Sequence, residues 1–279
     1  MALGPWLTSD DRKAVENVLL EGDLMSGKRV AQLEERLAEY FGKRHCVAVS
    51  SGTAALECAF VATGEGHHIH PHGFVAILSA ARAAKHPPEC EFRGVRTDVL
   101  GVEVKPTRHV HDCAHRFDKG AAHAEVSCFS ANVNKHVAAV GGFLVTDDSV
   151  VAATSRQYRN HGRDGGNEIF REGRNLRMGE MNAALALSQL ARIEEIIAKR
   201  EQVAKWYEEI LGQPAQGSFL YPYFTELPQH NKLRRMSSFR LFNTATQRDN
   251  QTVLLEIWPN MTKDETAAIC KTLNGCGSL

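Results

Sequence analysis

Apolar residues recur at helical spacing in two stretches near the start of the chain. The first, over residues 8–20, opens with a capping box formed by Thr8 and Asp11 and stops at Gly22. The second, over residues 28–41, repeats the same spacing of apolar positions on one face. The pattern predicts two amphipathic helices.

Short β-rich runs follow, and helical stretches separate several of them. The first run, residues 46–49, leads into an alanine-rich helix over residues 53–63 that Gly64 closes. Further strands are predicted at residues 74–77, 109–111, 126–129 and 143–146. This alternation favours an α/β fold with a mainly parallel sheet flanked by helices.

A long helix is predicted next, over residues 179–211. Leu190, Ile193 and Ile197 form its apolar stripe, and Glu195 with Lys199 makes an exposed ion pair one turn apart.

The end of the chain predicts a smaller, simpler unit. Residues 213–250 are polar and irregular, a strand is predicted at residues 253–257, and Thr262 with Glu265 caps a last helix. We expect a large domain over residues 1–190 and a small, reduced C-terminal α+β domain over residues 191–279.

Composition excludes some partners. Lys and Arg together number 33, as do Asp and Glu, so the chain has no bulk attraction to nucleic acid or to an anionic membrane. No apolar stretch is long enough to cross a bilayer, and no secretion signal opens the chain. The seven cysteines lie mostly in apolar segments without paired short spacing, which predicts reduced thiols in a cytoplasmic protein.

A first candidate for ligand binding lies between a strand and a helix. Ser51, Gly52 and Thr53 stand where N–H groups and the helix dipole attract an anion, and Gly52 lets a phosphate approach the backbone. The same residue types are also favoured for capping a helix, so this motif alone leaves both interpretations open.

Two further candidates follow predicted strands. Asp112 stands at the end of an apolar strand, where open α/β sheets place ligands, although it could instead cap a helix. Lys135 follows the strand that ends near Ser130, and a glycine pair at residues 141–142 comes after it. A single lysine is more often a surface residue, so its neighbours carry the argument.

The order and spacing of these motifs predict a site for pyridoxal phosphate (PLP). Lys135 would form a Schiff base with the cofactor, and Asp112 would keep its pyridine nitrogen protonated. The Ser51-Gly52-Thr53 turn, together with Ser130, would hold the phosphate.

Several separated motifs keep the order found in one enzyme family. They lie at residues 22–27, 51–56, 71–76, 111–115, 128–135, 141–142, 159–163, 175–178, 183–190 and 259–262. Across most of its length the chain resembles the DegT/StrS-type nucleotide-sugar aminotransferases, which are fold-type I PLP enzymes.

The resemblance implies further roles. Phe74 would stack on the cofactor ring, although it could also be a core residue, and His115 would approach the phenolic oxygen, where the family usually has Gln. Ser130 would bind the phosphate, with Asn132 also in the cofactor site. Asn175 would reach the cofactor phosphate of a neighbouring subunit, which implies a homodimer with shared active sites.

The chain also departs from the family. It lacks a strand–helix unit before His109, is several residues shorter between Asp112 and Lys135, and has less sheet at its C-terminal end. A Gly-Glu-Gly-Gly element reads Ala-Val-Gly-Gly at residues 139–142. The basic run at residues 232–240 is interpreted as a solvated face, with a nucleotide diphosphate pocket as the alternative.

A histidine-rich segment raises a metal hypothesis. His68, His70 and His72 would share one face of a strand, and imidazole is a common metal ligand. No cysteine or carboxylate nearby completes a site, and the family has a buried strand here. We therefore predict no metal.

The predicted activity is transfer of an amino group from an amino acid to a nucleotide-linked keto sugar. The family resemblance implies that the amino acid is glutamate. Lys135 and Asp112 are the predicted catalytic residues, and the partners are small molecules and a second copy of the chain. Two alternatives stay open. One is a catalytically silent, shortened homologue that binds PLP as an accessory or regulatory protein, and the other is an aminotransferase for a cyclitol ketone.

Overall fold

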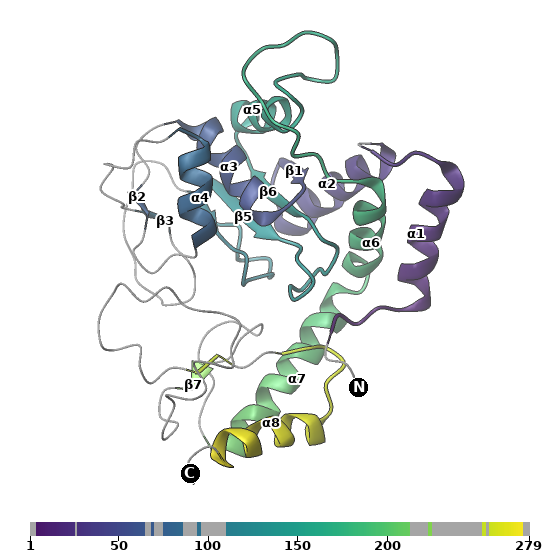
Figure 1. Cartoon of the computed structure of the whole chain (residues 1–279), viewed down its shortest axis with the longest axis vertical. Coiled ribbons are helices and arrows are strands. Elements are labelled where there is room, and N and C mark those ends of the chain that lie inside the picture. Colours follow the sequence, from purple (N-terminus) through teal and green to yellow (C-terminus); the bar gives the residue numbers. More distant parts are fainter. Residues whose placement is uncertain are drawn as a thin grey trace. The chain divides into compact units, whose positions relative to one another are not determined.

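The computed structural model describes residues 4–25, 27–64, 68–69, 75–85, 94–95, 110–212, 223–224, 253–254 and 257–275. The chain divides into two compact units, one of residues 7–192 and one of residues 1–6 with 193–279 (Figure 1). The domain boundary expected after residue 190 stays a prediction. In the described part of the chain, no helix is long and apolar enough to cross a membrane.

A four-stranded sheet organises the larger unit. Its strands are β1 (His45–Val49), β4 (Val110–Asp112), β5 (Val126–Ser130) and β6 (Gly142–Thr146), in the order β1-β6-β5-β4. β4 and β5 are parallel, whereas β6 is antiparallel to both β1 and β5. This sheet is therefore mixed rather than mainly parallel. The reason is that a short loop without a crossover helix joins β5 to β6, so the chain turns straight back.

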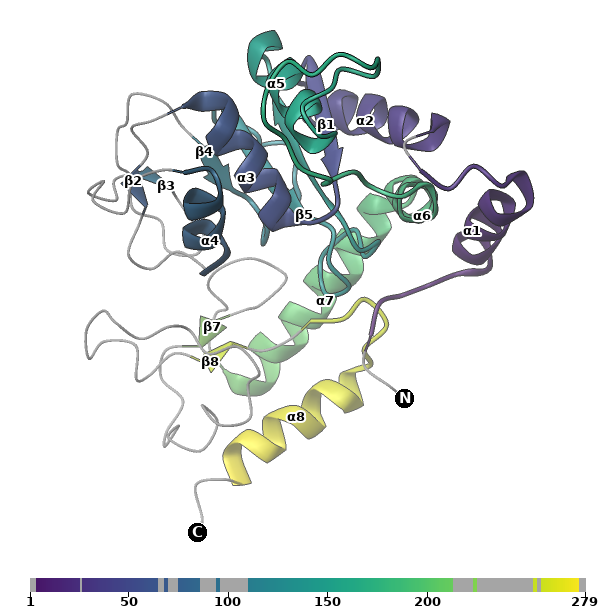
Figure 2. The same ribbon diagram turned by 45° about the horizontal axis from the view of Figure 1, so that its top comes forward.

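Helices cover both faces of this sheet. α3 (Gly52–Thr63) packs on it together with α5 (Ser149–Arg159), and α4 (Val75–Ala83) packs on α3 (Figure 1). α2 (Lys28–Phe41) lies on the other side with α6 (Glu180–Leu190), and α1 (Ser9–Glu21) packs on α6 (Figure 2). Leu56 and Phe60 of α3 are buried in one core with Val47 and Leu144 of the sheet.

The first two helices form as the apolar spacing predicts. Thr8 and Asp11 form the expected capping box, and Gly22 ends α1 in the left-handed conformation with a φ of 78°. That conformation carries no steric penalty for glycine.

The strand predicted at residues 74–77 is wrong. Residues 75–77 lie in α4, and Phe74 lies outside the described residues. Ile77, Ala80 and Ala81 are buried at helical spacing, and the alanine-rich continuation favours a helix. A four-residue apolar run cannot distinguish the two structures by periodicity alone.

The single long helix predicted over residues 179–211 is also wrong. Ala191 and Arg192 separate α6 from α7 (Ile193–Leu211). At this break the Arg192 guanidinium donates to the carboxylate of Asp11 in α1. The predicted pair of Glu195 and Lys199 is present in α7, with 3.8 Å between its charged atoms.

The smaller unit contains α7, α8 (Lys263–Gly275) and the antiparallel pair β7 (Tyr223–Phe224) and β8 (Val253–Leu254). Val203, Tyr207, Trp258 and Cys270 belong to its core. Thr262 and Glu265 cap α8 reciprocally, as predicted. The basic run at residues 232–240 lies outside the described residues.

A separate parallel pair, β2 (His68–Ile69) with β3 (Gly94–Val95), includes one of the three histidines of the metal hypothesis, His68. His70 and His72 lie outside the described residues. Across the described ranges, no group of three histidine, cysteine or acidic side chains is placed to hold a metal ion.

Side chains cover the outer edge of β1 and so fix the strand that leads to the candidate site. The Ala48 N–H donates to Glu34 at 2.9 Å, Arg156 donates to the Cys46 carbonyl at 2.9 Å, and Arg159 donates to both Glu34 and the Ala48 carbonyl. Beyond the strand, the Ser50 N–H donates to the Leu176 carbonyl at 2.8 Å. These bonds thus pair several backbone groups that an edge strand would otherwise leave exposed.

Candidate active site

The predicted site motifs meet at one edge of the four-stranded sheet. β1, β4 and β5 run in the same direction, so their C-terminal ends share this edge with the start of β6. Ser51, Asp112 and Ser130 stand at or just after those ends, and Gly142 opens β6. Open α/β sheets place their ligands at this edge.

The start of α3 is packed tightly against β5 and β6. Ser51 caps the helix, and its Oγ accepts the Ala54 N–H at 3.1 Å. A Cβ atom on Gly52 would lie 2.8 Å from the Cβ of Ser130, and one on Gly142 would lie 2.4 Å from the carbonyl carbon of Ser51. Only glycine allows both approaches. They bring the helix-start N–H groups, which have no partner within the helix, next to the Ser130 hydroxyl.

Asp112 is buried at the end of β4. Its Oδ1 accepts the Ala114 N–H at 3.0 Å, so it caps a turn rather than a helix. Cys128 lies opposite in β5. Burial, and secondarily the Asp112 charge, raise the pKa of the Cys128 thiol well above its usual value. All five cysteines in the described part of the chain are free and buried.

Lys135 is buried rather than on the surface. Its exposed fraction is 7%, and its Nζ lies 3.3 Å from Nε2 of His115. The Lys135 N–H donates to the Asn132 carbonyl at 2.8 Å, which closes a turn in the loop between β5 and β6. Sequence reasoning named both Lys135 and His115, and the fold brings them into contact.

His115 is electrically neutral in this position. Burial, and secondarily the charge of Lys135, lower its pKa from 6.5 to about 3. A neutral imidazole can accept a hydrogen bond from the Lys135 amine without adding charge repulsion.

The remaining predicted residues lie differently. Asn132 is exposed, and its N–H donates to the Ser130 Oγ at 3.3 Å. Asn175 is also exposed, and its Oδ1 accepts from Arg177 at 3.0 Å. Its segment runs beside the end of β1, because Arg177 bridges to Val49. The expected contact of Asn175 with a neighbouring subunit stays a prediction.

Two residues that sequence reasoning left without a role support the loop carrying Lys135. Asn182 Nδ2 donates to the carbonyls of Ala139 and Val140, at 2.8 and 2.9 Å, and Gln189 bonds to Ala138. Val140 has a φ of 53°, which is unusual for a β-branched residue. The sequence signal for this support was indirect. Gln189 belongs to the matched motif at residues 183–190, and Val140 belongs to the element at residues 139–142 that departs from the family.

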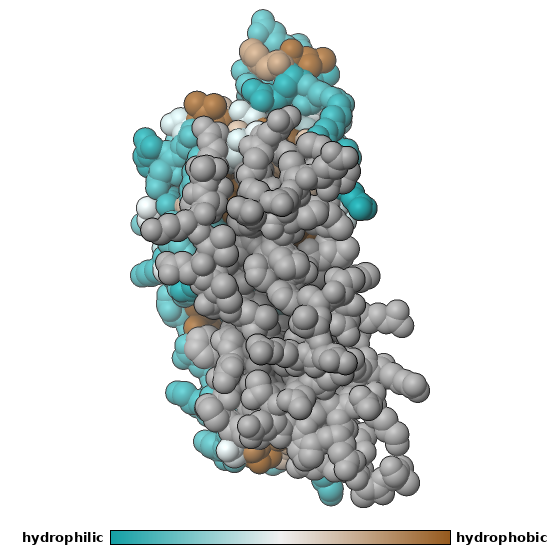
Figure 3. Space-filling view, turned by 90° about the vertical axis from the view of Figure 1, so that its left-hand side faces the viewer, coloured by the Kyte–Doolittle hydropathy of each residue, from teal (hydrophilic) through white to brown (hydrophobic). Residues whose placement is uncertain are grey.

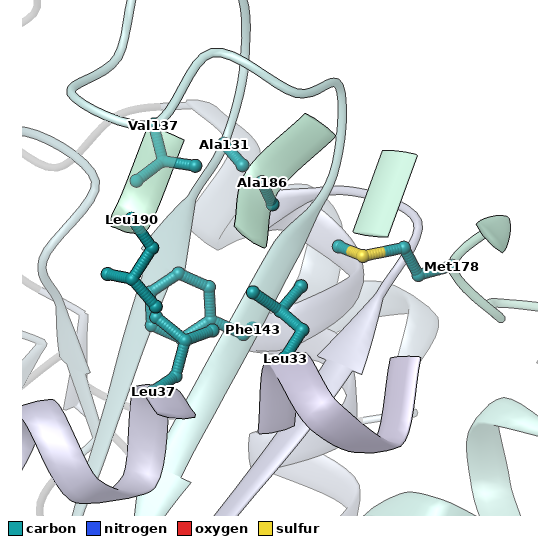
Figure 4. Close-up of a pocket in the computed structure, with 8 residues that line it drawn as sticks. All are labelled: Leu33, Leu37, Ala131, Val137, Phe143, Met178, Ala186 and Leu190. Carbon is teal, nitrogen blue, oxygen red and sulfur yellow. The ribbon is translucent and has the colours of Figure 1, made fainter. Parts of the chain in front are cut away.

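A small apolar void lies beneath the same loop, between α2, β6 and α6 (Figure 4). It measures about 10 Å³ and is lined by Leu33, Leu37, Ala131, Val137, Phe143, Met178, Ala186 and Leu190. A void of this size accommodates at most one water molecule. It is therefore a packing defect in the core, distinct from the polar sheet edge.

The residues at the sheet edge fit PLP. The close approach of Gly52 to Ser130 forms an anion-binding turn suited to a phosphate. A buried amine at Lys135 and a buried carboxylate at Asp112 follow the ends of neighbouring strands. An amine, a carboxylate and an anion-binding turn are the three groups that PLP enzymes use.

Comparison with known proteins identifies a family of aminotransferases. The sequence model of the DegT/DnrJ/EryC1/StrS aminotransferase family matches residues 5–88 and 109–236. The interval between these matches contains the stretch where a strand–helix unit was inferred to be missing.

Two relatives are similar along most of their length. A UDP-4-amino-4,6-dideoxy-N-acetyl-beta-L-altrosamine transaminase from Helicobacter pylori is 27% identical over 85% of this chain and 74% of its own. A UDP-2-acetamido-2-deoxy-3-oxo-D-glucuronate aminotransferase from Pseudomonas aeruginosa is 27% identical over 73% of this chain and 69% of its own.

The fold is shared with solved aminotransferases. Helicobacter pylori PseC, an aminotransferase involved in the biosynthesis of pseudoaminic acid, superposes with a TM-score of 0.77 at 20% identity. The match covers 99% of this chain and 98% of that one. Solved structures of similar fold include one in a PLP form and one with bound pyridoxamine phosphate.

Proposed function

The chain belongs to the DegT/DnrJ/EryC1/StrS aminotransferase family, and on that premise we propose that it moves an amino group from glutamate to the ketone of a nucleotide-linked sugar. Membership confirms the family resemblance, the fold class, the PLP cofactor and the aminotransferase activity expected from the sequence. The particular substrates belong to the proposal.

The relatives support the sugar as acceptor. By their names, one is the transaminase for a UDP-linked dideoxy sugar and the other acts on a UDP-linked 3-oxo sugar acid. A keto hexose carried on a nucleoside diphosphate is therefore the proposed substrate class. Glutamate as donor rests on the family resemblance.

The sheet edge would hold the cofactor in a defined orientation. Ser51, Gly52, Thr53 and Ser130 would bind its phosphate, and Lys135 would hold its reactive carbon. The roles proposed for His115 at the phenolic oxygen, Asn132 beside Ser130 and Phe74 on the ring follow from the family. When bound, PLP supplies a protonated ring that draws electron density from the carbon losing its proton.

Lys135 would act as the general base. Its Nζ would take the proton from Cα of the donor amino acid, which requires hydrogen-bond reach and an approach shielded from water. Burial of the side chain supports the shielding. The neighbouring His115 stays neutral at pH 7 and would orient the amine without competing for its proton.

Asp112 would keep the ring nitrogen protonated. Its buried carboxylate accepts one backbone N–H and stands at the end of β4, beside the strand that leads to Lys135. An ion pair in such a shielded position is stronger than one in water.

We propose a homodimer in which Asn175 completes the partner's site. Support comes from the family and from the loop between α5 and α6, which projects from the larger unit (Figure 1). Ile169 and Phe170 in this loop are 67% and 51% exposed, and apolar residues gather at its tip (Figure 3).

The buried thiols suit a reducing cytoplasm, where we propose that the enzyme acts.

The contact between the buried Lys135 and His115 carries this proposal, and spectroscopy of the PLP-loaded protein tests it. Adding glutamate should shift the cofactor's visible absorbance, and adding a UDP-linked 3-keto or 4-keto hexose should restore it. Restoration by a cyclitol ketone alone would support the cyclitol alternative. An absorbance that glutamate leaves unchanged at every pH would contradict the proposal and favour the catalytically silent homologue.

A further inference from the structure

The loop that carries Lys135 is closed at its base. Ala131 donates its N–H to the Gly141 carbonyl at 2.8 Å, and its own carbonyl accepts the Ala139 N–H at 2.9 Å. These bonds join the two arms of the loop, residues 131–141, just beyond β5 and β6. They do not determine how the closed loop is held relative to the rest of the larger unit.

Gln189 of α6 forms a two-way contact with one arm of this loop. Its Oε1 accepts the Ala138 N–H at 2.7 Å, and its Nε2 donates to the Ala138 carbonyl at 3.1 Å. The side chain is 2% exposed. A buried carboxamide thus pairs with the backbone as a neighbouring strand would, three residues from Lys135. Removing either partner would leave buried polar groups unsatisfied.

Asn182 and the underlying apolar residues extend this support. Asn182 precedes Gln189 by about two helical turns, so both side chains lie on one face of α6. It donates to the carbonyls of Ala139 and Val140. Val137 of the loop lines the apolar void together with Ala186 and Leu190 of α6 (Figure 4).

We propose that Gln189 is a positioning residue for the reaction, because its paired hydrogen bonds to Ala138 hold loop 131–141 so that the Lys135 amine stays beside His115. This inference rests on the proposed role of Lys135. Gln189 itself would touch neither cofactor nor substrate. Its effect is on where Nζ lies when the proton moves.

The consequence for catalysis follows from distance. Displacing a catalytic group by about 1 Å can lower a rate by roughly a hundredfold. A loosened loop should therefore lower kcat while leaving the binding of the amino acid nearly unchanged. If Gln189 only filled space, its replacement would not lower kcat selectively while leaving amino acid binding unchanged.

The test compares Gln189→Leu and Gln189→Glu with Gln202→Leu as a control. Gln202 lies on α7 in the smaller unit and is exposed. Gln189→Leu should raise hydrogen exchange in peptides from residues 131–141 by about tenfold in cofactor-free protein. With PLP bound, kcat should fall by about tenfold or more and KM for glutamate should change by less than about threefold. The control should change neither.

Gln189→Glu adds a readout that packing alone would not move. The carboxylate can accept the Ala138 N–H but cannot donate to its carbonyl, whereas the protonated acid can do both. Burial raises the pKa of such a carboxyl group, so the rate of the variant relative to wild type should recover as pH falls through that value. If Gln189→Leu does not fold, this recovery decides the matter.

Unchanged hydrogen exchange and unchanged kcat in both Gln189 variants would overturn the inference. A rate deficit in Gln189→Glu that is the same at every pH would do so as well. Failure of the proposed function looks different. In that case wild-type protein would lack cofactor on Lys135, while exchange in the cofactor-free loop would still report on Gln189.

Discussion

A buried lysine beside a neutral histidine lies at the centre of the candidate site. Lys135 Nζ lies 3.3 Å from His115 Nε2, and burial with the lysine charge keeps the histidine unprotonated at neutral pH. Both residues were named from the sequence because of their motif positions. Their contact depends on a turn after β4 and a loop after β5, which motif spacing does not define.

His115 should make the cofactor-free protein sensitive to acid. The unfolded chain binds this proton near pH 6.5 and the folded chain only near pH 3, so stability is lost as pH falls through that interval. Between pH 7 and pH 5, wild type should lose about 2 kcal/mol more of its free energy of unfolding than His115→Gln. Urea unfolding at the two pH values measures this, and equal losses would contradict the neutral histidine.

Asp112→Asn should impair turnover much more than cofactor retention. The phosphate turn at Ser51, Gly52 and Ser130 is intact in this variant, whereas the neutral amide cannot sustain a protonated ring. We expect kcat to fall by at least about a hundredfold while PLP remains bound through gel filtration. A variant with a near-normal rate of reaction with glutamate would contradict the role of Asp112.

At the scale of elements, one buried carboxylate joins two helices that support the site. Glu180, at the start of α6, is fully buried and accepts the N–H groups of Gly27, Arg29 and Val30 at 2.8, 2.9 and 3.0 Å. It thereby caps α2, whose own N-cap residue, Gly27, provides no side-chain bond. The same helix α6 holds the lysine loop through Asn182 and Gln189.

Glu180→Gln should therefore lower the free energy of unfolding by about 2–3 kcal/mol, because the amide replaces one acceptor with a donor facing donors. Glu39→Gln is the matched control. Glu39 is 71% exposed and its carboxylate makes a surface pair with Arg36 at 3.4 Å, so that change should stay within about 0.5 kcal/mol. Urea unfolding of the two variants checks this, and equal losses of free energy of unfolding would contradict the capping role of Glu180.

Periodicity and capping residues predicted the helices and strands that contain strong local signals. The capping boxes at Thr8 and Thr262 are examples. The signal failed where local patterns were ambiguous. The apolar run after Phe74 fits either a strand or a helix, and no local pattern marks the break at Arg192, where the side chain contacts the distant Asp11.

The residues of the candidate site likewise divide into those with a local sequence signal and those without one. Lys135, Asp112 and Ser130 could be named because they sit in motifs. Gln189 and Asn182 could not be assigned roles, because their hydrogen bonds join residues 51 and 43 positions apart. Such pairings exist only once the chain has folded.

At the scale of the whole molecule, the proposed dimer would share its active sites. Mixing Lys135→Ala protein with Asn175→Ala protein should restore activity, because one of the two sites in each hybrid has both residues intact. Random reassortment would recover about a quarter of the wild-type rate. Each variant alone serves as the control. A monomer in light scattering at working concentration, or no recovery after exchange of subunits, would contradict the shared site.

In the proposed reaction, Lys135 holds PLP and releases it to glutamate. Borohydride reduction of the PLP-loaded protein, with and without prior glutamate, followed by peptide mass mapping, tests both parts at once. We expect a pyridoxyl group on Lys135 without glutamate and its loss after glutamate is added. A label on another lysine, or a label on Lys135 that glutamate does not diminish, would contradict it.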